Sequence, residues 1–172
     1  MNLLVTGGCG FIGSNFIRLA LSKNEVKRLV NVDKMTYAAD FENTKEFENR
    51  QEYSHHHFCL TEYEKFWSVC KDNDITDIVH FAAETHVDNS IKGSKVFVQS
   101  NVVATHSILE TCKDRDIRLH HISTDEVYGE VLGKDRFTEN SHYNPKNPYS
   151  ATKAASDFLV KSYVNTYGTR AT

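Results

Sequence analysis

The sequence contains few prolines, few cysteines and no long apolar run, and each shortage excludes a class of protein. With two Pro and eight Gly among 172 residues, of which 40% are hydrophobic, the chain is neither collagen-like, a linker nor a disordered tail. The cysteines Cys9, Cys59, Cys70 and Cys112 form no CxxC pair, so neither a zinc site nor a redox motif is indicated. We therefore expect a globular protein with reduced, mostly buried thiols.

The sequence also lacks the features of a protein that spans a membrane or binds a nucleic acid. Its apolar stretches are far shorter than the ~20 residues of a membrane-spanning helix. Lys and Arg total 20 against 23 Asp and Glu, a net charge of −3, and no basic run is present. Met1 is followed by a short apolar run and a glycine loop, not by a basic region and a cleavage site. We expect a cytoplasmic protein that binds neither partner.

Three consecutive histidines, His55, His56 and His57, raise the question of a metal site. Adjacent residues of an extended segment point to alternating faces, so three neighbouring side chains cannot converge on one ion. No metal site is therefore predicted.

Apolar runs with β-branched residues alternate with longer segments of helical period, an order typical of βαβ units and a parallel sheet. Strands are expected at residues 3–6, 28–32, 57–60, 77–81 and 118–123. Helices are expected at residues 13–23, 62–71, 96–112 and 148–167, and residues 36–51 mix loop with short helix. In the last helix, Pro148 fits the first position and Asn147 the cap.

The spacing of apolar residues predicts which helix faces turn inward. In the first helix these residues are Phe16, Ile17, Ala20 and Leu21. In the second helix they are Tyr63, Phe66, Trp67 and Cys70, which we interpret as core. In the last helix they are Ala154, Ala155, Phe158, Leu159 and Val164.

A glycine-rich loop follows the first predicted strand and opens the first helix. Gly7 permits a tight turn, Gly10 lets the backbone approach a pyrophosphate without a Cβ in the way, and Gly13 allows the helix to pack closely on the strand. Free N–H groups and the positive end of the helix would hold the phosphates. Glycines collect at turns for structural reasons too, so the loop gains its meaning from this position in the chain.

Asp33 ends the second predicted strand, where a carboxylate can accept hydrogen bonds from both hydroxyls of an adenosine ribose. It would also repel the extra phosphate of NADP, although Lys34 beside it leaves the choice between NAD and NADP open. The alternative is a solvated aspartate in a turn. Strand, loop, helix, strand and acid together predict a Rossmann-type, doubly wound parallel sheet that binds a dinucleotide, with NAD as the expected cofactor.

Two further patterns suggest chemistry. Tyr149 and Lys153 lie four residues apart, on one face of the last predicted helix, and a nearby ammonium favours the phenolate of a tyrosine, lowering its pKa. The run Thr124, Asp125 and Glu126 lies at the C-terminal end of the fifth strand, the edge where open parallel sheets bind ligands. Regular strand geometry would send the two carboxyls to opposite faces, so we expect the backbone to leave the sheet there. An acidic loop after a strand is the simpler alternative.

Five stretches of the chain, GGCGFIGSNF, VDKMTYA, HFAAETHVDNSI, STDEVYGE and NPYSATKAASD, resemble the extended short-chain dehydrogenase/reductase superfamily. Within it they most resemble the nucleotide-sugar 4,6-dehydratases, from residue 3 to about residue 168. The related sugar epimerases usually place small hydroxyl residues where Asp125 and Glu126 stand. This resemblance implies a lyase that turns dTDP-glucose or UDP-glucose into a 4-keto-6-deoxy sugar by internal hydride transfer through NAD.

The resemblance also implies residue roles. Catalysis would fall to Thr124, Asp125, Glu126, Tyr149 and Lys153. The sugar would be approached by Thr85, His86 and Thr124. NAD would be bound by Gly7, Gly10, Phe11, Ile12, Gly13, Asp33, Lys34, Thr36, Cys59, Leu60, Phe81, Ala82, Ala83, Thr85, Ser123, Tyr149 and Lys153. A homodimer would pair helices 96–112 and 149–167.

The chain departs from the family pattern in three respects, of which the mildest is Ala104 in place of a glycine common in the helix after the fourth strand. Cys59 stands where family members usually carry an aspartate near the adenine, so one hydrogen bond to the base would be missing or replaced. Family members also continue with further strands and a smaller substrate-binding domain, so residues 1–172 would be an NAD-binding domain that lacks it, with the fifth strand an exposed edge. Two other functions therefore stay open: a catalytically silent NAD-binding module, and an epimerase or reductase of the same superfamily.

Overall fold

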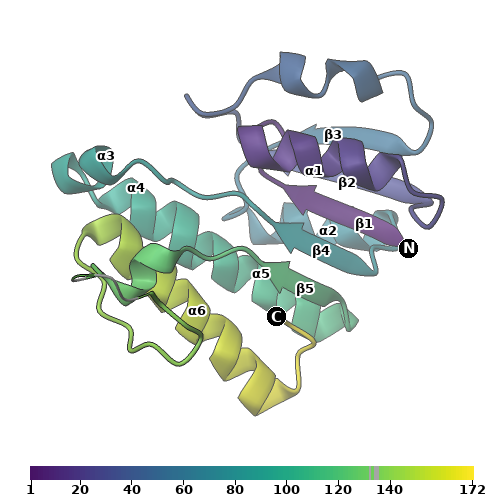
Figure 1. The fold of residues 1–172 in the computed structure, drawn as a ribbon. Coiled ribbons are helices and arrows are strands. Elements are labelled where there is room, and N and C mark those ends of the chain that lie inside the picture. Colours follow the sequence, from purple (N-terminus) through teal and green to yellow (C-terminus); the bar gives the residue numbers. More distant parts are fainter. Residues whose placement is uncertain (132, 134–135) are drawn as a thin grey trace.

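A computed structural model describes residues 1–131, 133 and 136–172, and five parallel strands form one sheet at its centre (Figure 1). The strands are β1 (Asn2–Thr6), β2 (Arg28–Asp33), β3 (Tyr53–His57), β4 (Asp77–His80) and β5 (Arg118–His121). Their order across the sheet is β3-β2-β1-β4-β5. The chain adds β2 and β3 on one side of β1 and then β4 and β5 on the other, so the order of the strands reverses between β1 and β4. This is the predicted doubly wound, Rossmann-type α/β fold.

Helices cover both faces of the sheet (Figure 1). The major helices are α1 (Phe11–Leu21), α2 (Tyr63–Asp72), α5 (Ala104–Arg115) and α6 (Pro148–Tyr167). The shorter helical segments are η1 (Phe41–Asn43), η2 (Lys45–Phe47), α3 (Val87–Lys92), α4 (Lys95–Phe97), the π-helical η3 (Val98–Val103) and η4 (Asp125–Tyr128). No helix in the described part of the chain is long and apolar enough to span a bilayer.

Two hydrophobic cores follow from the alternation of side chains along the strands. Leu3, Val5 and Leu29 face α1 and pack against Ile17 and Ala20. Their strand neighbours face the other way, toward α2, α5 and α6. That second core contains Leu4, Val30, Ile78, Leu119, Phe66, Ile108, Leu109 and Val160. Both faces of the central strands are therefore buried, which explains their continuous apolar runs.

The third strand lies earlier in the chain than predicted. The prediction was residues 57–60, but β3 is Tyr53–His57, and Phe58 to Leu60 form the loop after it. Polar side chains at Ser54, His55 and His56 gave the strand no apolar alternation, because β3 is an edge strand with partly exposed faces. His55 and His57 share one face of β3, where both rings contact Phe41 edge-on, and His56 alternates to the other face. Among the described residues, no group of His, Cys, Asp and Glu that could hold a metal ion is found.

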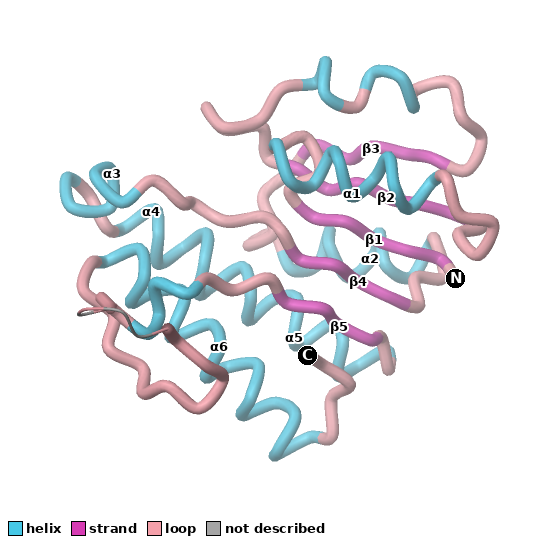
Figure 2. The backbone as a smooth tube through the Cα atoms, viewed as in Figure 1, coloured by secondary structure: helices cyan, strands magenta, loops and turns pink. Residues whose placement is uncertain are grey.

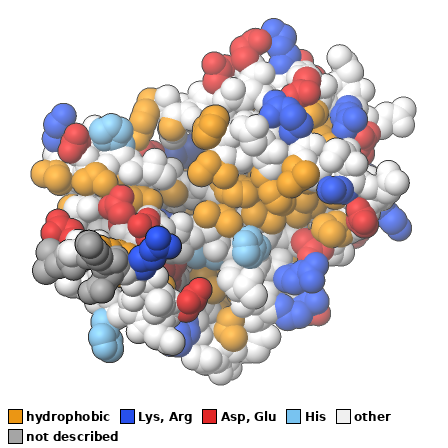
Figure 3. Space-filling model, in the orientation of Figure 1, with side chains coloured by type: hydrophobic (Ala, Val, Ile, Leu, Met, Phe, Trp, Pro, Cys, Tyr) orange, Lys and Arg blue, Asp and Glu red, His pale blue; other side chains and the backbone are white. Residues whose placement is uncertain are grey.

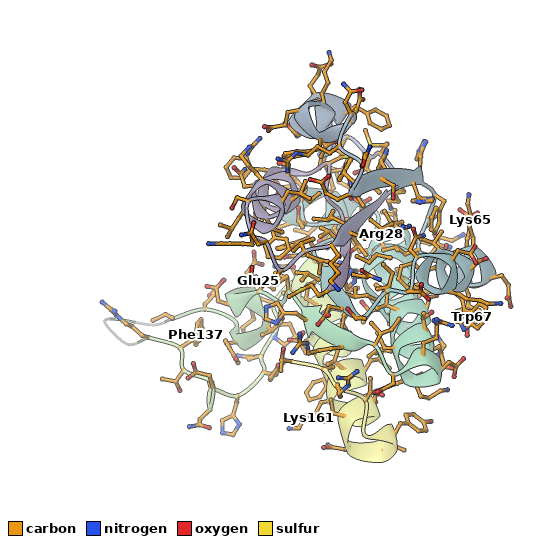
Figure 4. The ribbon with its side chains drawn as sticks, turned by 90° about the vertical axis from the view of Figure 1, so that its right-hand side faces the viewer. Glu25, Arg28, Lys65, Trp67, Phe137 and Lys161 are labelled. Carbon is orange, nitrogen blue, oxygen red and sulfur yellow. The ribbon has the colours of Figure 1, made fainter. Side chains whose placement is uncertain are left out.

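Two predicted helix faces also need correction. On α2, Phe66 and Cys70 are core, but Trp67 is only half-buried. The side-chain cations of Lys71 and Arg115 each lie 5.4 Å from the centre of its ring. Figure 4 shows Trp67 on the outer side of α2.

On α6, Phe158 and Val164 are exposed, whereas the polar residues Thr152, Lys153 and Ser156 are buried. The inward face of α6 is polar because it abuts the cavity described below and the side chain of Asn101. The predicted cap of α6 is confirmed, since the Asn147 side chain accepts a hydrogen bond from the Ser150 amide at 2.8 Å.

The fifth strand is not a fully exposed edge, contrary to the prediction. After α6 the chain returns to the sheet, and Ala171 pairs in parallel with Leu119. The Leu119 amide donates to the Arg170 carbonyl at 2.8 Å, and the Thr172 amide donates to the Leu119 carbonyl at 3.0 Å. Arg170 to Thr172 therefore cover part of the β5 edge.

Apolar side chains remain exposed on the α1 side of the molecule. Figure 3 shows them gathered near the centre of that face. Phe11, Ile12 and Leu19 of α1 are 82%, 63% and 55% exposed, and Phe81 and Ile122, beyond β4 and β5, are only partly buried. An exposed apolar area of this kind is typical of an interaction or ligand-binding surface.

Candidate functional site

A cavity of about 370 Å³ lies at the C-terminal edge of the sheet, where the strand order reverses. That volume falls in the range of small-molecule sites. The loops after β1, β2, β4 and β5 all open at this edge (Figure 2). Open parallel sheets bind ligands in such a crevice.

Every residue that the resemblance assigned to NAD lines this cavity. They come from the glycine loop, from the segments after β2, β3, β4 and β5, and from α6: Gly7, Gly10, Phe11, Ile12, Gly13, Asp33, Lys34, Thr36, Cys59, Leu60, Phe81, Ala82, Ala83, Thr85, Ser123, Tyr149 and Lys153. Seven lining residues had not been identified from the sequence: Val32, Ala38, Ala39, Phe58, Ser100, Ala104 and Ile122. Most are small or apolar, and only their place in the fold brings them to the cavity.

The glycine loop requires glycine at two positions. Gly7 has a φ of +70°, and a Cβ there would lie 2.7 Å from the backbone of Ala82. A Cβ on Gly13 would lie 2.3 Å from the Gly7 carbonyl oxygen, so α1 can approach the loop only with glycine. The first amides of α1 have no acceptor within the helix and face the loop end of the cavity. Backbone donors for an anion are thus placed at this end.

Asp33 joins the glycine loop to the segment after β2. Its carboxylate accepts a hydrogen bond from the Cys9 amide at 3.0 Å and from the Met35 amide at 2.8 Å. Each carboxylate oxygen has a second lone pair, so Asp33 can still accept hydrogen bonds from a ligand's hydroxyls. The side chain is buried at the cavity wall, as a ribose acceptor should be.

Tyr149 and Lys153 both lie on the buried face of α6 and line the cavity. Burial raises the pKa of Tyr149; the hydrogen bond with Thr124 opposes this, and the Glu126 carboxylate adds to it. The expected lowering of the Tyr149 pKa by Lys153 is therefore wrong. The Lys153 ammonium donates to the Ile122 carbonyl at 2.6 Å instead. Burial lowers the pKa of Lys153 to about 8.

The backbone leaves the sheet before the acidic pair, as predicted. β5 ends at His121, and Asp125 to Tyr128 form the 3₁₀ turn η4. The Glu126 carboxylate accepts a hydrogen bond from the side-chain amide of Asn147, the N-cap of α6, at 3.1 Å. That contact brings η4 to the start of the helix that carries Tyr149.

The structure does not bring all predicted site residues into the cavity. Thr124, Asp125 and Glu126 lie beside it, close enough to affect Tyr149, but do not line it. Thr85 and His86 are exposed, and only Thr85 reaches the cavity wall. Thr124 and the acidic pair thus gather at the Tyr149 end.

Asp157 is a site residue that the sequence analysis missed. Its carboxylate accepts hydrogen bonds from Ser123 at 2.6 Å and from Tyr143 at 3.1 Å, and it lies 3.3 Å from the His121 ring. It also raises the pKa of Lys153, against the effect of burial. Its position one turn after Lys153 on the helix was the signal that could have identified it.

Comparison with known proteins decides the family. Residues 4–172 match the GDP-mannose 4,6 dehydratase family. The chain belongs to this family. This confirms the resemblance to the nucleotide-sugar 4,6-dehydratases and assigns the chain to their N-terminal portion.

Several curated relatives of the chain are dTDP-glucose 4,6-dehydratases. The enzyme of that name from Mycolicibacterium smegmatis is 45% identical over all of the chain and 51% of its own length, and one from Escherichia coli is 40% identical over 98% and 51%. The chain thus spans about half the length of the curated relatives it matches. Such relatives are what the chain is similar to, and their activity is not thereby its own.

Solved structures of two enzymes with NAD bound match the fold closely. A dTDP-glucose 4,6-dehydratase from Streptomyces venezuelae, with NAD and TYD bound, has a TM-score of 0.95 at 37% identity and covers 99% of this chain and 54% of its own. A UDP-glucose 4-epimerase from Thermus thermophilus, in complex with NAD, has a TM-score of 0.89 at 27% identity, covering 99% and 53%. The fold alone therefore does not separate dehydratase from epimerase.

Proposed function

We propose that the chain binds NAD in this cavity and forms the dinucleotide-binding part of a nucleotide-sugar 4,6-dehydratase that acts on dTDP-glucose. The observation that carries the proposal is the meeting of Tyr149 and Lys153, on the cavity wall, with Thr124 and Glu126 beside them. The dehydratase names of the similar proteins support it.

The residues present fit NAD. Gly7 and Gly13 leave no room for a Cβ, so the loop backbone stays close to the first turn of α1, where amides can hold a pyrophosphate. Asp33 supplies an acceptor for ribose hydroxyls. Phe58, Leu60 and other apolar residues line the same cavity and suit an adenine ring. Cys59 lines it too and has no carboxylate to offer the base.

NAD, when bound, would supply the capacity to accept and give back a hydride, together with a positive charge near the phenol. Tyr149 would take the proton of the C4 hydroxyl, and the Thr124 hydroxyl favours its phenolate. Lys153 would do so only after its ammonium turns from the Ile122 carbonyl toward the phenol. Because burial raises the Tyr149 pKa, proton removal depends on positive charge close to the phenol.

The acidic pair would carry out the loss of water. Once C4 is a ketone, the C5 proton is acidic, and Glu126 would take it as a base. Asp125 would protonate the departing C6 hydroxyl, so that one water leaves and a double bond forms between C5 and C6. Addition of a hydride at C6 and return of the proton from Glu126 to C5 would then give the 4-keto-6-deoxy sugar. Glu126 is held for this role by Asn147. Asp125 is the neighbouring residue and is exposed.

The same family membership leads us to propose a homodimer through α5 and α6, and a cytoplasmic location. Val103 precedes α5 and is 43% exposed, and Val164 and Tyr167 of α6 are 36% and 57% exposed. Apolar side chains exposed on two neighbouring helices can be buried against a second copy of the same pair.

Turnover assays separate this proposal from its alternatives. The protein, loaded with NAD, is incubated with dTDP-glucose and, in parallel, UDP-glucose, and the products are identified by mass spectrometry and NMR. A 4-keto-6-deoxy product from dTDP-glucose supports the dehydratase, and C4 inversion without loss of water would mean an epimerase. NAD binding in a calorimeter without any product would mean a silent NAD-binding module. Failure to bind either NAD or a sugar nucleotide would overturn the proposal.

Matched variants test the residue roles. Glu126→Gln should lower the rate of product formation by about 10²-fold or more, as loss of a general base does. Glu130→Gln, an exposed carboxylate on the loop just beyond η4, is the control and should retain the rate. Equal rates in the two variants would exclude Glu126 as the base.

A further inference from the structure

The buried carboxylate of Glu84 holds the lysine that stands next to the proposed ribose acceptor. The Lys34 ammonium donates a hydrogen bond to the Ser100 hydroxyl at 2.6 Å and lies 3.1 Å from a Glu84 carboxylate oxygen. The Glu84 side chain is 8% exposed, and that of Lys34 is 30% exposed. Glu84 had no role in the sequence analysis, although it lies between two segments of the cavity wall.

Glu84 is itself fixed in place. Its amide donates to the side-chain oxygen of Asn101 at 2.8 Å, and the Asn101 amide group donates to the Glu84 carbonyl at 3.0 Å. The same amide group donates to the Thr152 hydroxyl of α6 at 2.9 Å. The segment after β4 is thus clamped to the π-helical turn and to α6. The backbone of Glu84 therefore has a defined position, and its carboxylate is held by burial and by the ion pair with Lys34.

At the Asp33 end of the cavity, the negative charge of Asp33 is not balanced by a free cation, so this end repels an anion. The charged residues of the described cavity wall are Asp33, Lys34 and Lys153, and Lys153 is engaged by Ile122. Lys34 is the cation adjacent to Asp33, and Glu84 neutralises it. If Lys34 turned toward a phosphate, the Glu84 carboxylate would stay buried without its partner, which is energetically costly.

We propose that Glu84 determines the choice of cofactor: by holding Lys34 in place, it denies the cavity the cation that a ribose 2′-phosphate would need, and so favours NAD over NADP. This inference rests on the proposed NAD site. It resolves the ambiguity of a lysine beside the ribose acceptor, since the lysine is committed to a buried carboxylate. Glu84 is thus a specificity-determining residue that acts through Lys34.

Calorimetric titration of the full chain with NAD and with NADP, at one salt concentration, tests the inference. The quantity compared is the ratio of the two dissociation constants. Glu84→Gln preserves the shape of the side chain but releases the ammonium, so the preference for NAD should fall roughly tenfold or more, as expected for a new charge-assisted hydrogen bond. In Glu84→Gln combined with Lys34→Gln, the preference should return toward that of the unmodified chain.

Two further variants keep the test decisive. Glu42→Gln removes an exposed carboxylate that pairs with Lys45 at 2.7 Å, away from the cavity, and should leave the ratio unchanged. Lys34→Gln alone should change the ratio by less than roughly threefold, because Lys34 is not available to a phosphate. If Glu84→Gln fails to fold, as checked by circular dichroism, the Lys34→Gln variant alone still decides the question. A roughly tenfold loss of NADP affinity relative to NAD would show that Lys34 is free.

The two proposals fail in different ways. If the unmodified chain binds NAD and folded Glu84→Gln keeps the same preference for it, the inference about Glu84 is wrong and the NAD site stands. If the unmodified, folded chain binds neither dinucleotide, the proposed function itself is wrong.

Discussion

Asp157 lies one helical turn beyond Lys153 on α6, and its carboxylate opposes the lowering of the Lys153 pKa that burial causes. The same carboxylate accepts a hydrogen bond from Ser123, the residue directly before Thr124. Asp157 therefore ties the end of β5 to the helix that carries the tyrosine and the lysine. Removal of the Asp157 charge should therefore affect both the end of β5 and the lysine on α6.

Asp157→Asn should lower the pKa of Lys153 below its present value of about 8. The physical reason is that burial remains while the nearby negative charge is gone. The measurement is an NMR titration that follows the side-chain carbons of Lys153. Asp116→Asn, at the far end of the fold, is the control. An unchanged midpoint in Asp157→Asn would show that Asp157 does not act on the lysine.

The stability of the chain should rise with pH through the contribution of Lys153. The Lys153 pKa is lowered from 10.5 to about 8 in the folded state. Between these two pH values the unfolded chain binds the proton that the folded chain has released, so raising the pH relieves the cost of a buried charge. From pH 7 to pH 9 this contribution amounts to about 1 kcal/mol.

Urea unfolding at the two pH values measures the effect. The free energy of unfolding of the unmodified chain, relative to that of Lys153→Met, should increase by that amount. Lys161→Met, on the exposed side of the same helix, provides the comparison. If the difference in free energy of unfolding between the unmodified chain and Lys153→Met is the same at both pH values, the Lys153 pKa is not lowered in the folded state.

Gly13→Ala should destabilise the chain by roughly 1 to 3 kcal/mol and disturb the glycine loop. The added Cβ would lie 2.3 Å from the Gly7 carbonyl oxygen, a contact with rigid backbone that can be relieved only by moving α1. Gly93→Ala is a matched control, since a Cβ there meets nothing within 4 Å. Thermal melting and NAD titration of both variants check the expectation. Equal melting temperatures would refute the close packing of α1 on the loop.

Val103→Glu should dissociate the proposed homodimer. A carboxylate at this position would be buried without a partner when two copies pair through α5 and α6. Leu19→Glu, also exposed but on α1, should leave the assembly intact. Sedimentation of both variants measures the state of association. The proposed interface is contradicted if the unmodified chain sediments as a monomer at all concentrations. It is also contradicted if the Val103→Glu variant stays dimeric.

Much of the fold followed from local patterns. The glycine loop, the cap at Asn147 and the apolar strands β1, β2 and β4 depend on short-range rules, and the structure has them at or within a few residues of the predicted positions. β3 did not follow, because an edge strand with polar side chains has no apolar alternation to read.

The site was predictable in its backbone and less so in its pairings. Lys34 and Glu84 are distant in sequence, and no local sequence pattern predicts the ion pair between them. The pKa of Tyr149 depends on how deeply α6 is buried, which local spacing does not reveal. The polar inward face of α6 was misassigned for the same reason, since Thr152, Lys153 and Ser156 are buried where apolar residues were expected.

The central claim, that the cavity beside the glycine loop binds NAD, is tested most directly by two-dimensional ¹H–¹⁵N NMR of the labelled chain during an NAD titration. The account predicts saturable shifts in the amides of Gly10 to Gly13, of Asp33 to Thr36 and of Phe81 to Thr85, with little change along the outer side of α2. Shifts confined to other surfaces, or none at NAD concentrations that saturate relatives of this family, would contradict it.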